Sequence, residues 1–386
     1  MIMKKNYGRF IALFLYMCIL SVIIYNSYDV TYAEDIQTTA QSYVLIESET
    51  CRILKDHNSS QELPMGTMNK LMTILLAAEA INEGKLSFDQ ELTASATANS
   101  SKGATIWLMT GEKMNVRDLI KGLIIGNAND AAVVFAEALG GDTVSFVEDM
   151  NRRADELGMK NTIFTAPGGV DDENQHTTSY DMALLTREVV KYDFLKEIMT
   201  TWLDYVRDGK TELVNENNLV RSYNGILGVK ACHSEKFGYS LAAAAERNGE
   251  TYIAVVLCCE DKDERFSVGK KLLNTGFSVY KTIIPGFSGE HMMPLKVRHG
   301  TDSAVETEAA YLPPLVIPKG SEGKMETIIF LPEYIDAPLK KGQCVGTIGF
   351  YAEETLLYET PLVTVSSVGK NTFLKSFKKI IVKMFK

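Results

Sequence analysis

The feature that most constrains this chain is the stretch 64–73, in which Pro64 precedes a threonine and a lysine that stand three residues apart. Helix-forming residues follow directly, so Thr67 and Lys70 are expected at the start of a helix and on one face of it. A hydroxyl nucleophile needs this arrangement if a neutral lysine is to take its proton. The stretch therefore predicts a nucleophilic site, with the unusual feature that the hydroxyl belongs to threonine.

Length and charge set the frame around this site. At 386 residues the chain exceeds one ordinary hydrophobic core, so two domains plus extensions are expected. The last seventeen residues, 370–386, hold six lysines and no acidic residue, so the remainder is more acidic than the net charge of −9. An acidic body of this kind argues against nucleic acid as a partner.

The N-terminus, residues 1–33, has the pattern of an export signal. Three basic residues precede an apolar run at 11–25, and Ala33 supplies the small residue at which such signals are cleaved. The run is short for a membrane-spanning helix. We therefore expect the protein to be exported from the cytoplasm.

The C-terminal tail, 370–386, has the pattern of an amphipathic helix. Such a helix lies in the interface of an anionic membrane, where each lysine adds about 1 kcal/mol of attraction. This predicts a protein held at the extracytoplasmic face of the cell membrane; the alternative is a helix that packs on its own domain. The apolar face is formed by Phe373, Phe377, Ile380, Ile381 and Met384.

The cysteines and histidines do not predict a structural metal, a cofactor or a disulfide framework. Five cysteines remain outside the signal, an odd number without paired spacing, and the five histidines are scattered. Cys258 and Cys259 are adjacent in a strand-like run, so their side chains are expected on opposite faces of a sheet.

The order of expected elements predicts an α+β fold, in which strands from both ends of residues 38–284 flank a helical middle. A break near 285–289 precedes residues 290–368, which read as a small all-β domain. The expected strands are 42–46, 51–54, 226–230, 239–245, 251–257, 311–317, 325–331, 343–351 and 356–365, and the expected helices are 74–81, two within 116–139, 179–191 and 266–273.

Further motifs follow the threonine–lysine pair in a fixed order. Together they resemble the penicillin-binding D-alanyl-D-alanine carboxypeptidases, the low-molecular-mass, membrane-anchored serine peptidases with a β-lactamase-like transpeptidase domain. The resemblance extends from Tyr43 to the C-terminus. The segments that carry it are Leu63–Pro64, Lys70–Thr73, Gly111–Lys113, Asp118–Ile120, Asn127–Ala132, Asn161–Thr162, Pro167–Asn174, Asn215–Leu219, Gly228–Lys230, Pro338–Gln343 and Pro361–Val363.

The resemblance implies a protein that removes the terminal D-alanine from peptidoglycan stem peptides through an acyl-serine intermediate, which β-lactams also form. By position, Thr67 takes the place of the nucleophile and Lys70 that of the general base. Asn127 stands where a second serine relays protons. The remaining positions assigned in this way are Asn129 and Lys230 in the catalytic motifs, and Ala231 and Cys232 in the substrate-binding strand.

Four departures from the family pattern weaken the chemistry. The extra methyl of Thr67 fixes its χ1 angle and crowds the path of attack, and Asn127 cannot shuttle a proton as a hydroxyl does. Ala231 lacks a hydroxyl for the substrate carboxylate, and Cys232 puts a side chain where glycine lets a peptide approach the strand. Because catalytic residues act as a unit, we expect a much reduced turnover, and whether the protein is an enzyme stays open.

Other interpretations remain at this stage. The chain could be a non-catalytic relative that binds peptidoglycan or a wall-synthesis partner. A β-lactamase is less well supported, because such enzymes lack the β domain and the basic tail. Cys232 could be a thiol nucleophile, but its neighbour His233 is expected to point to the other face of the strand.

Overall fold

The computed structural model describes residues 36–169, 172–285, 293–352 and 355–371. The expected signal at 1–33 and residues 372–386 of the expected amphipathic tail lie outside these ranges. Within the described ranges, no helix has the length and apolar character needed to cross a membrane.

The first body is built on a five-stranded antiparallel sheet with the strand order β2-β1-β11-β10-β9. Its middle strands are continuous apolar runs that are buried on both faces, as expected of strands covered on two sides. Strand β9 lies at the edge, so one side of its backbone is left unpaired within the sheet. The strands are β1 (Ser42–Glu47), β2 (Ile53–His57), β9 (Ile226–Ser234), β10 (Gly238–Arg247) and β11 (Glu250–Cys259).

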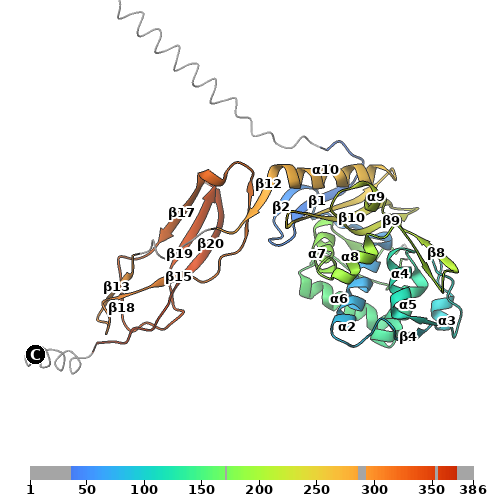
Figure 1. The fold of residues 1–386 in the computed structure, drawn as a ribbon, viewed down its shortest axis with the longest axis horizontal. Coiled ribbons are helices and arrows are strands. Elements are labelled where there is room, and N and C mark those ends of the chain that lie inside the picture. Colours follow the sequence, from blue (N-terminus) through green and yellow to red (C-terminus); the bar gives the residue numbers. More distant parts are fainter. Residues whose placement is uncertain (1–35, 170–171, 286–292, 353–354, 372–386) are drawn as a thin grey trace, which may run out of the picture. The chain divides into compact units, whose positions relative to one another are not determined.

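Helices cover both faces of this sheet (Figure 1). Helix α10 (Glu264–Val279) runs along one face, and α7 (Ser179–Val189) packs with the other helices against the opposite face. The predicted α+β class, with an antiparallel sheet and a helical cluster, is confirmed. The other helices of the cluster are η1 (Gly66–Asn69), α2 (Lys70–Asn82), α3 (Ala96–Asn99), α4 (Val116–Ile124), α5 (Asn129–Gly140), α6 (Thr143–Leu157), α8 (Asp193–Met199) and α9 (Leu219–Ser222).

Helix α2 is the centre of the cluster. Nine of its residues are buried, including Lys70 at its first position, because the helix is apolar almost all round. Met65, Met68 and Met72 are at most 1% exposed, which confirms that they serve as core packing.

Local sequence signals explain where several helices begin. Asn115 caps α4 by accepting the Asp118 N–H at 2.7 Å, and Thr178 caps α7 by accepting the Asp181 N–H at 3.0 Å. Each cap satisfies a backbone donor that the helix cannot pair internally.

Three short antiparallel strand pairs complete this body. They are β3 (Leu63–Pro64) with β6 (His176–Thr177), β4 (Glu91–Thr93) with β5 (Lys113–Asn115), and β7 (Leu203–Val206) with β8 (Thr211–Val214). The first of them anchors the C-terminal end of the loop over the predicted nucleophile, which we call the covering loop (described residues 164–169 and 172–175).

The C-terminal β region has two small apolar cores, one around Phe350 and one around Val297. One sheet has the order β15-β20-β19-β17, a second has the order β14-β13-β18, and β12 pairs with β16. The strands are β12 (Tyr280–Ile283), β13 (Leu295–Arg298), β14 (Ala304–Val305), β15 (Thr307–Ala309), β16 (Leu315–Pro318), β17 (Met325–Phe330), β18 (Tyr334–Asp336), β19 (Cys344–Ala352) and β20 (Thr355–Thr364).

The cysteines of the described chain are all free. Cys258 Sγ lies 3.8 Å from the Pro64 carbonyl oxygen, whereas the acidic neighbours that raise the pKa of Cys259 include Glu264 of α10. The two adjacent thiols therefore lie on opposite faces of β11, as the alternation of side chains along a strand predicts.

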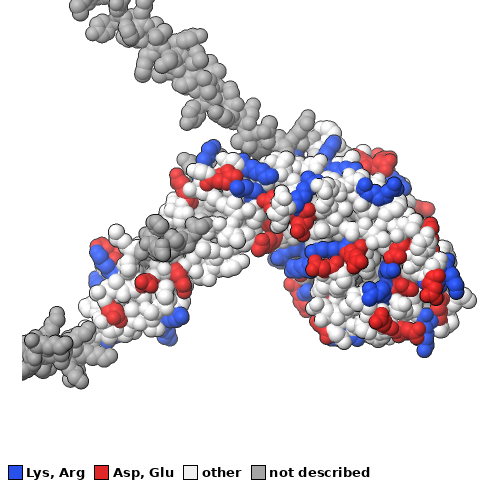
Figure 2. Space-filling view, viewed as in Figure 1, with Lys and Arg blue, Asp and Glu red and all other residues white. Residues whose placement is uncertain are grey.

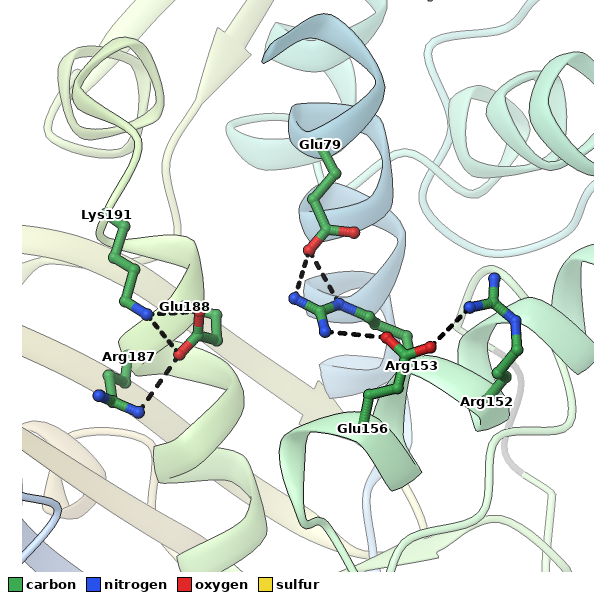
Figure 3. Close-up of polar contacts among 7 residues, drawn as sticks. All are labelled: Glu79, Arg152, Arg153, Glu156, Arg187, Glu188 and Lys191. Atoms are coloured by element: carbon green, nitrogen blue, oxygen red, sulfur yellow. Dashed lines mark hydrogen bonds and ion pairs between the residues drawn. The ribbon is translucent and has the colours of Figure 1, made fainter. Parts of the chain in front are cut away.

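Charged side chains of both signs are interspersed on the face shown in Figure 2. A network of such charges joins α2 to α6 (Figure 3). Arg153 Nε is 2.9 Å from Glu79 Oε1, and Arg153 Nη1 is 3.0 Å from Glu156 Oε2. Arg152, in contrast, pairs among the described residues only with Asp149 and Glu156 of its own helix.

The two arginines predict different effects on stability. Arg153→Met should lower the melting temperature by about 2–4 °C, because it leaves the partly buried Glu79 without its partner. Arg152→Met is the matched control and should change it by at most about 1–2 °C, since its pairs are exposed. Calorimetry of both variants checks this, and equal losses would contradict the assignment of Arg153 as the helix-to-helix link.

Candidate active site

The threonine–lysine pair lies between the helical cluster and the edge strand of the sheet. Thr67 is in the 3-10 turn η1, directly before α2, and Lys70 is the first residue of α2. Lys230 is in the middle of β9, where it pairs with Ala242 of β10. The predicted nucleophile, the predicted base and the strand lysine are thus gathered in one cleft.

Both lysines point at the same asparagine. Lys70 Nζ donates to Asn127 Oδ1 at 2.9 Å and to the Asn127 carbonyl oxygen at 2.6 Å, and Lys230 Nζ donates to Asn127 Oδ1 at 2.6 Å. Asn127 adopts a φ of 53°, a left-handed conformation that asparagine tolerates better than most residues. A single amide oxygen therefore joins the second motif to the first and the third.

Burial determines the protonation of these amines. Lys70 is 0% exposed, and this burial, together with the neighbouring Lys230, holds its pKa well below the ordinary value. Burial also lowers the pKa of Lys230. A neutral Lys70 amine can donate its two protons to Asn127 and still keep a lone pair, as a general base requires.

The Thr67 hydroxyl is not engaged by this base. Its Oγ1 is buried, and no nitrogen or oxygen atom of the described residues forms a hydrogen bond with it. The methyl group packs against Gly169, where an added Cβ would lie 2.4 Å from Thr67 Cγ2. The backbone of the covering loop thus closely fits the methyl that distinguishes threonine from serine.

That covering loop is attached to the start of α2 by buried amide and hydroxyl groups. Asn69 Nδ2 donates to the carbonyl oxygens of Ala166 and Gly168 at 3.1 and 2.8 Å. Thr73 Oγ1 donates to the Pro167 carbonyl at 2.6 Å. Gln175 Nε2 reaches back to the Gly66 carbonyl at 3.3 Å, so the loop is bonded on both sides of Thr67.

Asn129 lies at the rim, but its amide group is used by the surrounding loops. Its Nδ2 donates to the carbonyl oxygens of Lys102 at 2.6 Å and Gly169 at 3.1 Å, and its Oδ1 accepts the Gly169 N–H at 3.0 Å. In this conformation Asn129 positions the covering loop. A pocket of about 690 Å³ with mainly apolar walls adjoins Asn129 and the loop residues Gly168 and Gly169.

Strand β9, which is predicted to bind substrate, carries small side chains at positions 231 and 232. Ala231 and Cys232 are both buried, and the Cys232 thiol interacts with the Thr67 hydroxyl. Burial raises the pKa of the Cys232 thiol, which outweighs the opposing effects of Arg265, Lys230 and Thr67. This does not favour a thiolate nucleophile. His233 is exposed and stacks on Tyr239, so it faces away as predicted.

Two charged residues that the sequence analysis did not assign belong to the site. Arg265 of α10 is buried and donates from Nη1 to the Cys232 carbonyl and, at 3.4 Å, to the Ser240 carbonyl. Glu216 acts electrostatically on Lys70, Lys230, Cys232 and Arg265. Glu216 lies within the motif segment 215–219, where its position was the available signal, whereas only the tertiary fold brings Arg265 to the site.

Comparison with known families agrees with this geometry. A family model described as D-alanyl-D-alanine carboxypeptidase matches residues 29–261, and one described as the C-terminal domain of penicillin-binding protein 5 matches residues 280–370. The fold, the site and these matches define a low-molecular-mass penicillin-binding protein. The chain belongs to the D-alanyl-D-alanine carboxypeptidase family.

Individual relatives give the same result over most of their length. The chain is 34% identical to the D-alanyl-D-alanine carboxypeptidase DacF of Bacillus subtilis, over 88% of each protein. Its structure is similar to that of penicillin-binding protein 5 from Haemophilus influenzae, with 29% identity, a TM-score of 0.79, and coverage of 87% of this chain and 99% of the other. Penicillin-binding protein D2 of Listeria monocytogenes, solved with ampicillin bound, is 27% identical with a TM-score of 0.57, covering 63% of this chain and 99% of that one.

The lowered pKa of Lys70 predicts a pH-dependent stability. Unfolding lets Lys70 take up a proton, because its ordinary pKa is about 10.4, so the free energy of unfolding of the wild type should rise with pH between the lowered pKa and that value. Lys70→Met lacks this dependence. The free energy of unfolding of the wild type minus that of the variant should therefore increase as the pH rises from 7 to 10. The increase should be at most about 1.4 kcal/mol per pH unit.

Urea unfolding of both proteins across this pH range measures the difference. Lys102→Met, at an exposed lysine, is the matched control and should follow the wild type at every pH. A constant difference between Lys70→Met and the wild type would show that Lys70 stays protonated in the folded state.

Proposed function

We propose that this protein acts in cell-wall metabolism by recognising peptidoglycan stem peptides in a carboxypeptidase-family cleft in which turnover is much reduced. The family match and the relatives named above support the substrate class. The ampicillin complex of the Listeria relative supports β-lactams as further ligands of the same cleft.

The observation that carries the reduced turnover is the disconnection of Thr67 from Lys70. An acyl-transfer cycle requires the hydroxyl oxygen to bond to the peptide carbonyl while its proton moves to a base, and then the departing D-alanine amine to receive a proton. Among the described residues, Thr67 Oγ1 has no nitrogen or oxygen partner, and Lys70 Nζ donates twice to Asn127. Misplacement of the attacking atom by about 1 Å can cost on the order of a hundredfold in rate.

Asn127 extends the same argument to the second half of the cycle. A hydroxyl can accept one proton while it donates another, whereas an amide oxygen only accepts. Asn127 Oδ1 holds the two amines in place, so it supplies structure without a path for protons. Residual activity through Thr67 and a neutral Lys70 would be slow.

A second candidate, a non-catalytic binding protein, is favoured by the packing over Thr67. The methyl contact with Gly169 and the buried Cys232 thiol occupy space next to the hydroxyl, without disturbing the unpaired edge of β9. An extended peptide can add to such an edge through backbone hydrogen bonds. In that case the cleft would bind a stem peptide or a wall-synthesis partner and never acylate.

We further propose that the protein works outside the cytoplasm, at the membrane surface. The signal pattern of residues 1–33 and the amphipathic pattern of 370–386 support this location. The family's substrate is also found outside the cytoplasmic membrane.

Labelling with a fluorescent penicillin tests the catalytic proposal. The wild type should give a covalent adduct at least about a hundredfold more slowly than a variant that carries Thr67→Ser, Asn127→Ser, Ala231→Thr and Cys232→Gly together. Thr67→Ala in the wild-type background is the control and should abolish any residual adduct.

The outcomes separate the two candidates. If the wild type is labelled slowly and Thr67→Ala removes the label, the weakly active enzyme is supported. If the wild type is not labelled but the restored variant is, the binding protein is supported. Labelling of the wild type as fast as the restored variant would refute the reduced turnover.

The tail predicts lipid binding that depends on charge. Deletion of residues 370–386 should reduce co-sedimentation with vesicles containing 30% anionic lipid by at least about tenfold, because six lysines are lost. Vesicles of neutral lipid are the control and should retain little of either protein. Equal sedimentation of the full chain and the deletion variant would argue against membrane attachment through this segment.

A further inference from the structure

The loop between α3 and β5, residues 100–112, presents a tryptophan to solvent. Trp107 is 74% exposed, whereas its neighbours Ile106 and Leu108 are each 1% exposed. The backbone on either side is fixed, because the buried Asp130 carboxylate accepts the Ile106 N–H at 3.1 Å and the Leu108 N–H at 2.9 Å. The indole is therefore held outward by bonds in which it takes no part.

The backbone of Trp107 adopts a conformation that tryptophan disfavours. Its φ angle is 56°, in the left-handed region that glycine and asparagine tolerate and that is strained for a bulky side chain. An indole as exposed as this one adds little to the core, so folding alone does not explain a tryptophan here. Backbone strain of this kind is typical of positions that contact a ligand.

The loop is bonded directly to the rim of the cleft. The Asn129 N–H donates to the Ala104 carbonyl at 2.7 Å, and Asn129 Nδ2 donates to the Lys102 carbonyl at 2.6 Å. Asn129 also pairs with Gly169 of the covering loop. Because Trp107 is three residues beyond Ala104, its backbone lies within about 11 Å of the Ala104 backbone.

A second segment with exposed apolar side chains adjoins this loop. Arg207, in the turn between β7 and β8, donates from Nη2 to the Trp107 carbonyl at 3.3 Å. The two strands carry Leu203, Tyr205 and Val214, all of which are exposed. Exposed apolar side chains that gather on neighbouring segments mark ligand-binding or interaction sites.

The chemistry of peptidoglycan identifies the ligand. The N-terminus of its stem peptide is joined to a chain of β-1,4-linked N-acetyl sugars, so a cleft that holds the C-terminal end of the peptide has sugar rings nearby. Four residues separate the reacting carbonyl from the sugar, a span of at most about 14 Å, which matches the reach from the rim to Trp107. The C–H face of an uncharged sugar ring packs on an indole, whose N–H remains free for a polar partner.

We propose that Trp107 is a binding residue for the glycan part of peptidoglycan and stacks its indole on an N-acetyl sugar ring. The inference rests on the proposed function, which places the peptide part of the same ligand in the cleft. It goes beyond that function by adding a sugar subsite outside the catalytic motifs.

The first experiment compares a free pentapeptide that ends in D-alanyl-D-alanine with the same pentapeptide attached to an N-acetylglucosaminyl-N-acetylmuramyl disaccharide. The full chain should bind the disaccharide form on the order of tenfold more tightly in isothermal titration calorimetry. Trp107→Asn should bring the two dissociation constants close together and leave the affinity for the free peptide unchanged. Because asparagine tolerates a left-handed backbone, this variant should fold with an unchanged or higher melting temperature.

Tyr311→Asn is the matched control, because Tyr311 is an exposed aromatic residue of the C-terminal β region. This variant should keep the preference for the disaccharide form.

A second measurement uses the sugar alone. The chain has two tryptophans, so Trp202→Phe leaves Trp107 as the one that fluoresces. A β-1,4-linked N-acetylglucosamine tetramer should shift the emission of this variant to shorter wavelength, because the sugar removes water from the indole.

The outcomes separate this inference from the proposed function. If the full chain binds both peptides equally, or if Trp107→Asn weakens both to the same degree, Trp107 does not contact the sugar, and peptide recognition still stands. If neither peptide binds, the proposed function fails, and the tetramer decides the inference, which stands if the emission shifts and falls if it does not. If Trp107→Asn alters the oligomeric state or vesicle binding but not sugar binding, the indole belongs to an interface with a second copy or a membrane, and the inference is wrong.

Discussion

The site depends on burying two lysine amines around one amide oxygen. Two buried ammonium groups that share one acceptor atom would repel each other strongly. The site is therefore stable only if protonation of the two lysines is reduced and their remaining N–H groups find acceptors. Asn127 supplies those acceptors through its side chain and its backbone. The same contacts hold α2 against the edge of the sheet, so the geometry of the cleft and its electrostatics have one origin.

Binding and turnover make different demands on such a cleft. Recognition requires shape and an available strand edge, and β9 has such an edge. Turnover requires groups that bind the transition state better than the substrate, including atoms that can pass protons on. At Thr67 and Asn127 the polar atoms are present without a group that both accepts and donates a proton between them, which is the physical basis of the reduced turnover that we propose.

Much of this could be predicted from the sequence, because the informative signals are local. The motif order placed Thr67, Lys70 and Lys230 in one site, and the apolar runs predicted the sheet and its covering helices. Strands of two to four residues, such as β14, carry too little pattern to be recognised. The double role of Asn127, the use of Asn129 by the covering loop, and the arrival of Arg265 all depend on tertiary contacts between residues far apart in the sequence, which no spacing rule contains.

The bonds that hold the loop over Thr67 have an evolutionary consequence. They are made by Asn69, Thr73 and Gln175, none of which stands at a position assigned to the reaction. The attachment of this loop and the reacting hydroxyl are therefore encoded in separate residues. A lineage could replace the group at position 67 without breaking any of these bonds, and selection on the remaining surface could then give the same scaffold a different task.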